Sequence, residues 1–370
     1  MSCKAPSRCK PSDHAEASRA SSLLSRLDGL PSRAAWALWF LLGSIAGLLL
    51  VPRLASGFDV AAGLRSEVVV SGVPRPVQLA FDGGGALVVL SQGWRGDAAG
   101  EVYRFDRRAS FPVDASRAPR VVIPFADEPR KTLLGSLAAD PDTGELFLGE
   151  ENGNRIYRLG VGHRLEMMVV GLNHLLGGSS ITLDRRGRLV FLDYASPEMH
   201  LRSEAPLPPS LMWLTEEAYR GPVVFRVDVH EDRPLPRRAD LLLSILPQQG
   251  SPGMEPLWRL IAVTSAGDDL VFLSAIGEVF RVGLDGALRS MVRLPAGHYH
   301  RTNLAAARDG SVFVCGGFHI RRIYRIAPDG AVSLVASELG DPGGIVLDDA
   351  GALYVAETAL HRIIRITPNP

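Results

Sequence analysis

One short pattern recurs six times along the chain and constrains its fold more than any other feature. Each copy has an apolar alternating run, a turn that contains Asp or Gly, and a second apolar run, as in "SITLDRRGRLVFLD" and "GIVLDDAGALYVAE". Alternation of this kind is typical of strands, and Asp and Gly allow the chain to reverse tightly. The six copies begin at Gln78, Ser136, Ser180, Ile261, Asn303 and Gly344.

A third strand follows every pair, for example "GEVYRFD", "NRIYRLG" and "HRIIRIT", and a fourth is readable in several units, such as "AVSLVASEL". Copies without a long insertion start about 41 to 44 residues apart, which is enough for four strands and their turns. Six four-stranded units predict an all-β, six-bladed β-propeller over residues 66–370.

The last unit ends after its third strand, at Thr367, which would leave an open sheet edge. An unpartnered strand is available near the start of the domain, in "SEVVVSG" from Ser66 to Gly72. We therefore expect this N-terminal strand to complete the sixth blade and close the ring.

The segment that precedes the propeller is different in character. Eighteen residues from Ala34 to Val51, "AAWALWFLLGSIAGLLLV", carry no charge, and they predict a transmembrane helix over residues 34–52 that acts as a signal anchor. Residues 1–33 are expected to form a flexible tail, and residues 53–65 a linker. Six Lys and Arg residues in the tail place the N-terminus in the cytoplasm and the propeller on the outer, periplasmic side. A cleaved signal peptide is the alternative.

Charge and cysteine content limit the partners. Lys and Arg together number 40, as do Asp and Glu, so the chain lacks the basic excess that neutralises phosphates, and nucleic acid is not expected as a partner. Cys315 stands alone in the propeller and is expected to be a small core residue. The expected partners are the membrane and a small molecule or envelope protein.

A propeller places the starts of its first strands and the loops between its second and third strands on one face, around the channel mouth. We expect the ligand on this face. The candidates at the mouth are Gln78, Ser136, Ser180 and Asn303, with Ile261 and Gly344 at the equivalent positions, and His174 and His319 come from nearby loops. In "HYH", alternation puts His298 and His300 on one side of the chain, where either could act as a general base.

Two further features belong to this face. The insertion from Tyr194 to Gly221 has apolar residues that suit a lid, a partner surface or a helix packed on its blade. Glu357 and His361 lie in the loop of the last unit and are expected to be rim residues.

The runs "DDAGALYVAETALHRIIRI", "GEENGNRIYRL" and "PDGAVSLVASELGDPGGIVLD" resemble the gluconolactonase/regucalcin-like, strictosidine-synthase-like and NHL-repeat propellers. The resemblance implies a hydrolase of lactones or esters that holds one divalent cation, commonly calcium, with Glu, Asn and Asp at the starts of its inner strands. Only Asn303 matches that pattern in place and type, while Gln78 stands where a Glu is expected. A displaced site that uses Glu150, Asp193 or Glu357 with Asn303 is the remaining option. Two functions stay open: a binding module, which the neutral mouth favours, and a hydrolase with a degenerate or displaced metal site.

Overall fold

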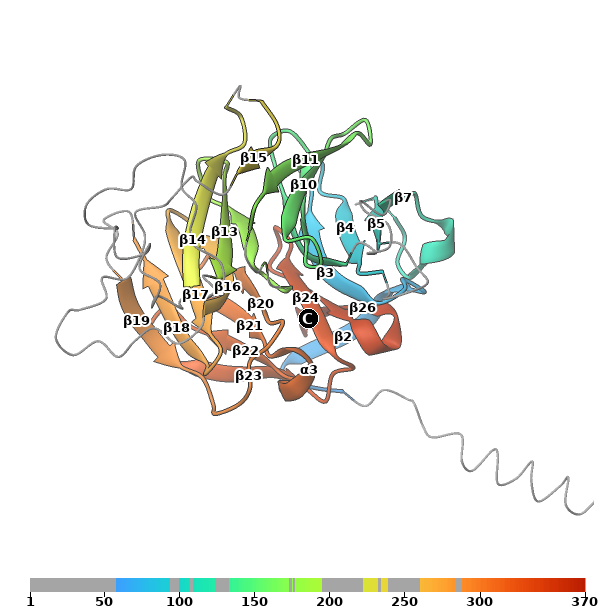
Figure 1. Cartoon of the computed structure of the whole chain (residues 1–370). Helices are drawn as coiled ribbons and strands as arrows, with labels where there is room; N and C mark the ends of the chain where they lie inside the picture. The colour runs from blue at the N-terminus through green and yellow to red at the C-terminus, as the bar shows by residue number, and fades with distance from the viewer. Residues whose placement is uncertain are drawn as a thin grey trace, which may run out of the picture. The chain divides into compact units, whose positions relative to one another are not determined.

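Six β-sheets arranged around a central axis form the propeller, and their strands follow the sequence repeat (Figure 1). The computed structural model describes residues 58–93, 100–106, 109–123, 133–172, 175, 177–194, 222–231, 234–238, 260–283 and 288–369. These residues belong to one unit, Phe58–Pro370. The expected tail, the expected membrane helix at 34–52, His174 and most of the 194–221 insertion lie outside the described residues. Within the described ranges, the structure has no helix of the length and apolar character needed to span a membrane.

The first three blades each keep the first strand innermost, in contact with the first strands of the neighbouring blades, and add later strands outward. Blade 1 contains β3 (Pro76–Phe81), β4 (Leu87–Ser91), β5 (Gly100–Phe105) and β7 (Arg120–Ile123). Blade 2 contains β8 (Leu134–Ala139), β9 (Leu146–Glu150), β10 (Arg155–Leu159) and β11 (Leu165–Val170), with β15 (Arg237–Arg238) parallel to β11. Blade 3 contains β12 (Ile181–Leu183), β13 (Arg188–Tyr194) and β14 (Pro222–Asp228).

The last three blades follow the same plan. Blade 4 contains β16 (Leu260–Ala266), β17 (Asp269–Ser274), β18 (Glu278–Val282) and β19 (Leu288–Arg293). Blade 5 contains β20 (Asn303–Ala306), β21 (Val312–Cys315), β22 (Ile323–Ile326) and β23 (Val332–Ser337), with β1 (Asp59–Val60) on its outer edge. Blade 6 contains β24 (Pro342–Leu347), β25 (Leu353–Glu357), β26 (Arg362–Pro368), β2 (Leu64–Ser71) and β6 (Val113–Asp114). Within the described residues, three short helices are η1 (Ala115–Arg117), α3 (Gly317–Ile320) and η3 (Thr358–Leu360).

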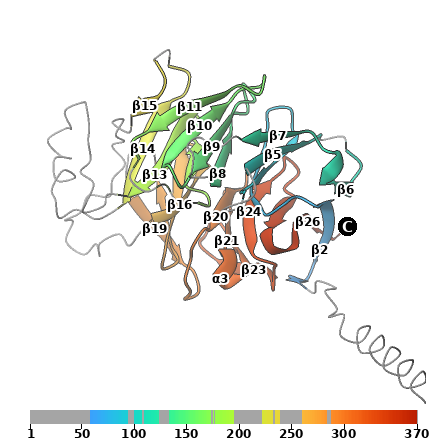
Figure 2. The same cartoon turned by 45° about the vertical axis from the view of Figure 1, so that its right-hand side comes forward.

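Ring closure occurs as the sequence predicted. Strand β2 pairs antiparallel with β26, with Leu64 opposite Pro368 and Ser71 opposite Arg362. Figures 1 and 2 show the blue β2 beside the red β26. The N-terminal strand therefore covers the edge that the last repeat leaves open, because an unpaired edge would expose backbone hydrogen-bonding groups.

The turns between first and second strands use the expected chemistry. In blade 6, for example, the side chain of Asp348 accepts hydrogen bonds from the backbone amides of Ala350 and Ala352, and Gly351 has a φ of 82°. Only glycine adopts such a φ without a steric cost, so these short reversals need it.

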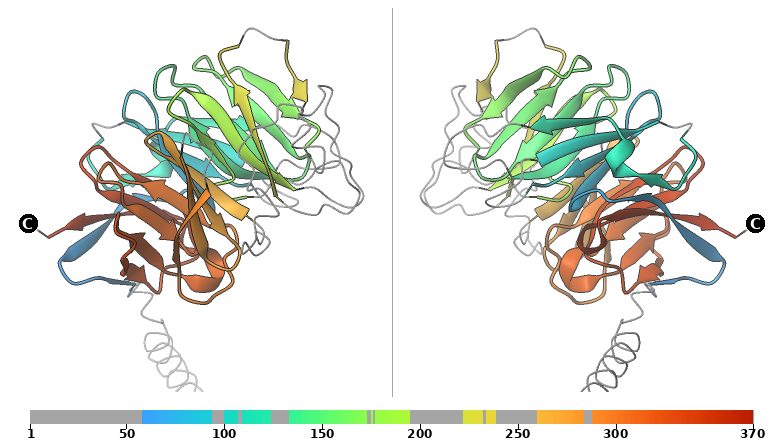
Figure 3. Two further views of the ribbon diagram at one scale, coloured as in Figure 1. Left: turned by 90° about the vertical axis from the view of Figure 1, so that its left-hand side faces the viewer. Right: turned by 90° about the vertical axis from the view of Figure 1, so that its right-hand side faces the viewer.

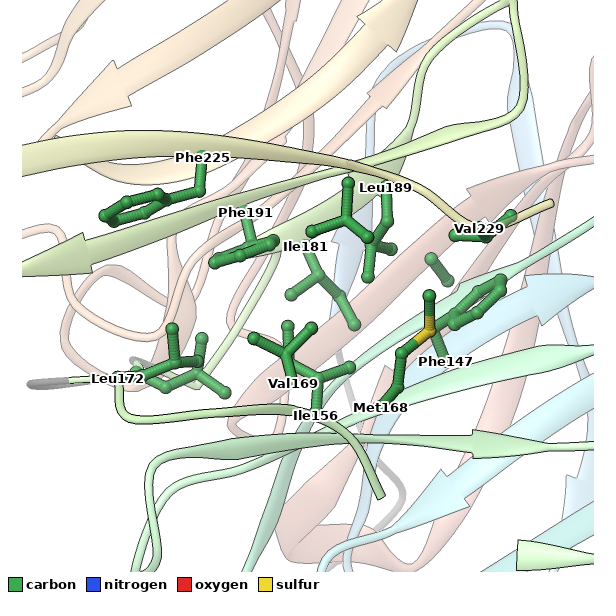
Figure 4. Close-up of a cluster of buried hydrophobic side chains, with 13 residues drawn as sticks. Phe147, Ile156, Met168, Val169, Leu172, Ile181, Leu189, Phe191, Phe225 and Val229 are labelled. Atoms are coloured by element: carbon green, nitrogen blue, oxygen red, sulfur yellow. The ribbon is translucent and has the colours of Figure 1, made fainter. Parts of the chain in front are cut away.

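The core lies in the gaps between neighbouring blades. Each of six clusters of buried apolar side chains joins two adjacent sheets. Figure 4 shows the cluster between blades 2 and 3, where the rings of Phe191 and Phe225 stack with centroids 5.5 Å apart, near Val169 and Ile156. Full burial of one such side chain contributes about 1.5–3 kcal/mol. The apolar side chains packed between neighbouring blades thus hold the ring together. Figure 3 shows the sheets in two opposite side views.

Candidate functional site

Two faces of the propeller must be distinguished. The upper face is the one on which the first strands begin, and it carries α3, η3 and the connections that enter β3, β8, β12, β20 and β24. The lower face carries the turns between first and second strands, such as Asp140–Gly144 in blade 2. Every candidate site residue of the sequence analysis that the structure describes belongs to the upper end of its blade.

The upper end of the channel is sealed by backbone. Residues 177–180, which lead into β12, reach across to three other blades. The amide of Gly178 donates to the carbonyl of Gly135 at 2.9 Å, the amide of Ser179 donates to the carbonyl of Thr302 at 3.0 Å, and the carbonyl of Ser179 accepts from the amide of Val263 at 2.6 Å. A hydrogen-bonded backbone segment therefore crosses the place where the channel mouth was expected.

Close approach of the inner strands completes this seal. A Cβ atom on Gly344 would lie 2.5 Å from the Cα atom of Gln78 on the neighbouring strand β3, so only glycine fits there. The buried side chain of Gln78 points to the same region, where its Nε2 atom lies 3.4 Å from the carbonyl oxygen of Gly135. Ser136 and Ser180 are also fully buried.

Asn303 is the central link of this region. Its Oδ1 atom accepts a hydrogen bond from the Ser179 hydroxyl at 2.7 Å, and its Nδ2 atom donates to the carbonyl of Gly343 at 2.8 Å. The Ser179 hydroxyl oxygen in turn accepts from the amide of Leu304 at 3.1 Å. Asn303 thereby connects blades 3, 5 and 6 across the channel.

The carboxylates of Glu150 and Glu357 have matching structural roles at the ends of β9 and β25. Glu150 accepts hydrogen bonds from the backbone amides of Leu133, Asn152 and Gly153, at 2.7–3.2 Å. Glu357 accepts from the amide of Gly340 at 2.8 Å and pairs with Arg362 at 2.5 Å. Both are buried and hold the upper loops of their blades in place.

This position is equivalent in every blade and is always buried. An alignment of the residues at or next to the ends of the second strands would have revealed it: Ser91, Glu150, Asp193, Ser274, Cys315 and Glu357. Cys315 is a core residue as expected, since its thiol contacts the carbonyl of Pro342 at 3.1 Å and burial raises its pKa to about 12. The rim residue His361 also binds backbone, because its Nδ1 atom accepts from the amide of Arg75 at 3.0 Å.

Three histidines gather on the upper face beside α3. The rings of His298 and His300 stack with centroids 5.9 Å apart, as alternation in "HYH" predicted. His319 meets them edge-on, with its ring centroid 5.0 Å from that of His298 and 6.4 Å from that of His300. Tyr299 between them is buried, and its hydroxyl donates to the carbonyl of Pro295 at 2.8 Å. Among the described residues, no group of three or more His, Cys, Asp or Glu has an arrangement that could hold a metal ion.

A charged constellation lies next to these histidines. Arg301 pairs with Glu151 at 2.6 Å, and the Glu151 carboxylate covers Gly135 and Gly177 at the sealed channel end, where a Cβ atom would come within 2.1 and 2.4 Å of it. Burial raises the pKa of Asp341, while the nearby positive charges of Arg75, Arg301 and His319 act in the opposite direction.

No motif in the sequence marks Arg75, Arg301 or Asp341 as site residues. Their signal is positional: each stands one or two residues before an inner strand and has a φ of 45–55°, which is uncommon for a residue other than glycine. Backbone strain of this kind concentrates at functional sites.

The two larger of the cavities found among the described residues lie away from the upper face. One of about 580 Å³ occupies the channel below the seal and extends to the lower-face turns, and its polar lining includes Gln78, Thr182, Thr264 and Asp142. Another of about 780 Å³ lies between blades 5 and 6, with Leu334, Phe313 and Leu353 among its apolar lining.

Comparisons with known proteins bear on the fold. No family model and no curated protein matches the sequence. The structure resembles virginiamycin B lyase from Staphylococcus aureus, solved with quinupristin, at 13% identity over 84% of this chain and 100% of that chain, with a TM-score of 0.52. It also resembles a gluconolactonase from Xanthomonas campestris, at 16% identity over 86% of this chain and 93% of that chain, with a TM-score of 0.52. The chain is therefore a six-bladed propeller with gluconolactonase-like proteins among its structural neighbours, as the repeats predicted.

Proposed function

We propose that the chain is a membrane-anchored, periplasmic propeller that binds a small molecule or an envelope protein on its upper face. The anchor is the apolar segment 34–52, with the N-terminus in the cytoplasm. The observation that supports the binding proposal is the group of charged side chains around the Arg301–Glu151 ion pair. This group lies over the backbone at Gly135 and Gly177, and Arg75, Asp341 and the three histidines are close to it.

The charges of this constellation indicate the chemistry of the ligand. Arg301 keeps 41% of its side chain exposed while it pairs with Glu151. A ligand carboxylate or phosphate could take over one edge of its guanidinium, because Arg presents donors in a fork that matches planar or tetrahedral anions. Glu151 and Asp341 are carboxylic acids whose oxygens accept hydrogen bonds, and they favour a ligand that also carries hydroxyl or amine donors.

Two of the residues predicted to hold a cation, Asn303 and Glu150, do not fit that role as they stand. Asn303 and Glu150 already use their side-chain oxygens for hydrogen bonds within the fold, and calcium needs several free oxygen ligands. No step of this proposal passes through a metal ion.

Ligand binding is tested by thermal denaturation of the full chain against a panel of carboxylates, phosphates and sugar acids. We expect compounds that stabilise the wild-type protein to lose this effect on Arg301→Gln. The control is Arg308→Gln, because Arg308 forms an ion pair of the same 2.6 Å length with Asp349 between two lower-face turns. Equal stabilisation of the wild type and both variants would remove the upper face from consideration.

A hydrolase of lactones or esters is the second candidate. The gathering of His298, His300 and His319 favours it, as does the presence of enzymes among proteins of this fold. His298 or His300 would take a proton from water as it attacks the substrate carbonyl, and Arg301 would stabilise the resulting oxyanion.

The hydrolase is tested with a gluconolactone and an aryl ester, in the presence and absence of a chelator. Turnover that disappears in His298→Ala and His300→Ala but persists in the lower-face control His163→Ala would establish the enzyme. Turnover that both upper-face variants retain would exclude this assignment.

A further inference from the structure

The propeller's N-terminal end enters on the upper face. Strand β1 pairs antiparallel with β23 so that Asp59 lies opposite Ser337, the residue at the upper end of β23. The ring of Phe58 lies 5.7 Å from the guanidinium carbon of Arg362, which begins β26 on the same face. Figures 1 and 2 both show the blue start of the described chain on the side of the ring that carries α3.

The length of the connecting chain limits which face can reach a membrane. In the proposed function, which this inference rests on, the anchor ends at Pro52, and only five residues separate it from Phe58. Those residues span at most about 18 Å when fully extended. Strand β2, with eight residues, is itself about 27 Å long. The chain is therefore too short to pass along a blade and let the lower face meet the bilayer.

The upper face also carries a side chain suited to the membrane interface. Phe318 in α3 is 62% exposed, whereas its neighbour Ile320 packs against the core between blades 4 and 5. Gly317, with a φ of 69°, and Arg321, whose amide donates to the carbonyl of Gly317, fix this turn. The fold thus holds a large aromatic side chain outward on a rigid support.

Polar groups around Phe318 complete an amphipathic surface. His298, His319, Arg321 and Arg322 are exposed, and the ring centroid of His319 lies 5.2 Å from that of Phe318. Aromatic rings with adjacent basic groups are typical of residues that lie among lipid headgroups.

We propose that this α3 surface, Phe318 with His298, His319, Arg321 and Arg322, rests on the lipid bilayer that holds the anchor. The upper-face constellation then opens toward the headgroup region, and the ligand reaches it from the membrane surface.

The test uses the full chain with Cys3→Ser and Cys9→Ser, since the remaining native thiol, Cys315, is fully buried. A nitroxide is attached to Phe318→Cys or to Val161→Cys. Val161 is the matched control because it is 60% exposed and lies in the lower-face turn between β10 and β11. Both proteins are placed in vesicles of phosphatidylcholine and phosphatidylglycerol, and spin relaxation is measured with oxygen and with a water-soluble nickel chelate.

We expect oxygen to relax the label at 318 more than nickel does, and the reverse at 161. Equal accessibility ratios at both positions would overturn the proposal that the α3 surface rests on the bilayer. If the same protein floats with the vesicles and resists alkaline extraction, the anchor itself is still supported. A label at 318 that neither reagent reaches would mean that protein covers α3, which also overturns the proposal. Protein that fails to float would overturn the anchor itself.

Discussion

Replacement of Asn303 separates a structural role for this residue from a role in ligand or metal binding. Asn303→Ala removes the hydrogen bonds to the Ser179 hydroxyl and to the Gly343 carbonyl, and it leaves both groups without these partners. An unsatisfied buried group costs about 1–3 kcal/mol. Because Ser179 and Gly343 are half-buried, the lower half of this range applies to each, and the total is about 2–4 kcal/mol.

This loss converts into a measurable shift in melting temperature. With an unfolding entropy of about 2.1 cal/mol/K per residue, a unit of the size of Phe58–Pro370 loses about 1.5 °C per kcal/mol. Asn303→Ala should therefore lower the Tm by about 3–6 °C. The exposed Asn369→Ala serves as the control and should leave the Tm unchanged.

A double-mutant cycle with Ser179→Ala attributes the effect to the link across the channel. Since the two side chains are in direct contact, we expect a coupling energy of about 1 kcal/mol or more. A Tm for Asn303→Ala within about 1 °C of the wild type would refute the structural role. If ligand binding or hydrolysis were lost at the same time, Asn303 would belong to the site itself.

Three further predictions follow from buried groups and from ring closure. Glu357→Gln should lower the free energy of unfolding by about 3–5 kcal/mol, because it removes the negative charge that faces the Arg362 guanidinium, which is only 15% exposed. Glu67→Gln, at the more exposed pair with Arg365, should have little effect. Thermal denaturation measures both. Burial raises the pKa of Asp341 in the folded state, so ionisation of this carboxyl lowers the stability above that pKa and has no effect below the unfolded value. Asp341→Asn should therefore have a higher Tm than the wild type at pH 8, and the difference should vanish toward pH 4. An equal decrease in Tm at every pH would contradict this prediction. A chain that lacks residues up to Gly72 should aggregate on size-exclusion chromatography because β26 then has a free edge, and a monomeric product would show that β2 is dispensable.

The architecture can be predicted from the sequence because its determinants are local. Alternation, Asp and Gly turns and the repeat length each act within a few residues, and they are sufficient to predict six blades. Closure by "SEVVVSG" also follows from sequence, since the last repeat lacks one strand and a spare strand is present.

The site depended on contacts that no local pattern encodes. Ser179 and Asn303 are separated by 124 positions and nevertheless bond across the channel. Glu150 looks like a candidate ligand in sequence, but the direction of its side chain makes it a cap for its own loop. The histidines are an intermediate case: alternation paired His298 with His300 and the repeat placed His319 on the same face, but only the turn of α3 brought its ring against that of His298.

The sequence by itself determined the number of blades, their order and the way the ring closes, because hydrophobic periodicity and turn chemistry are properties of neighbouring residues. The tertiary structure alone decided that the upper channel end is sealed, which polar groups serve the fold and which remain exposed. Those outcomes depend on close approach between distant segments, where a missing Cβ atom or the direction of one side chain determines what can fit.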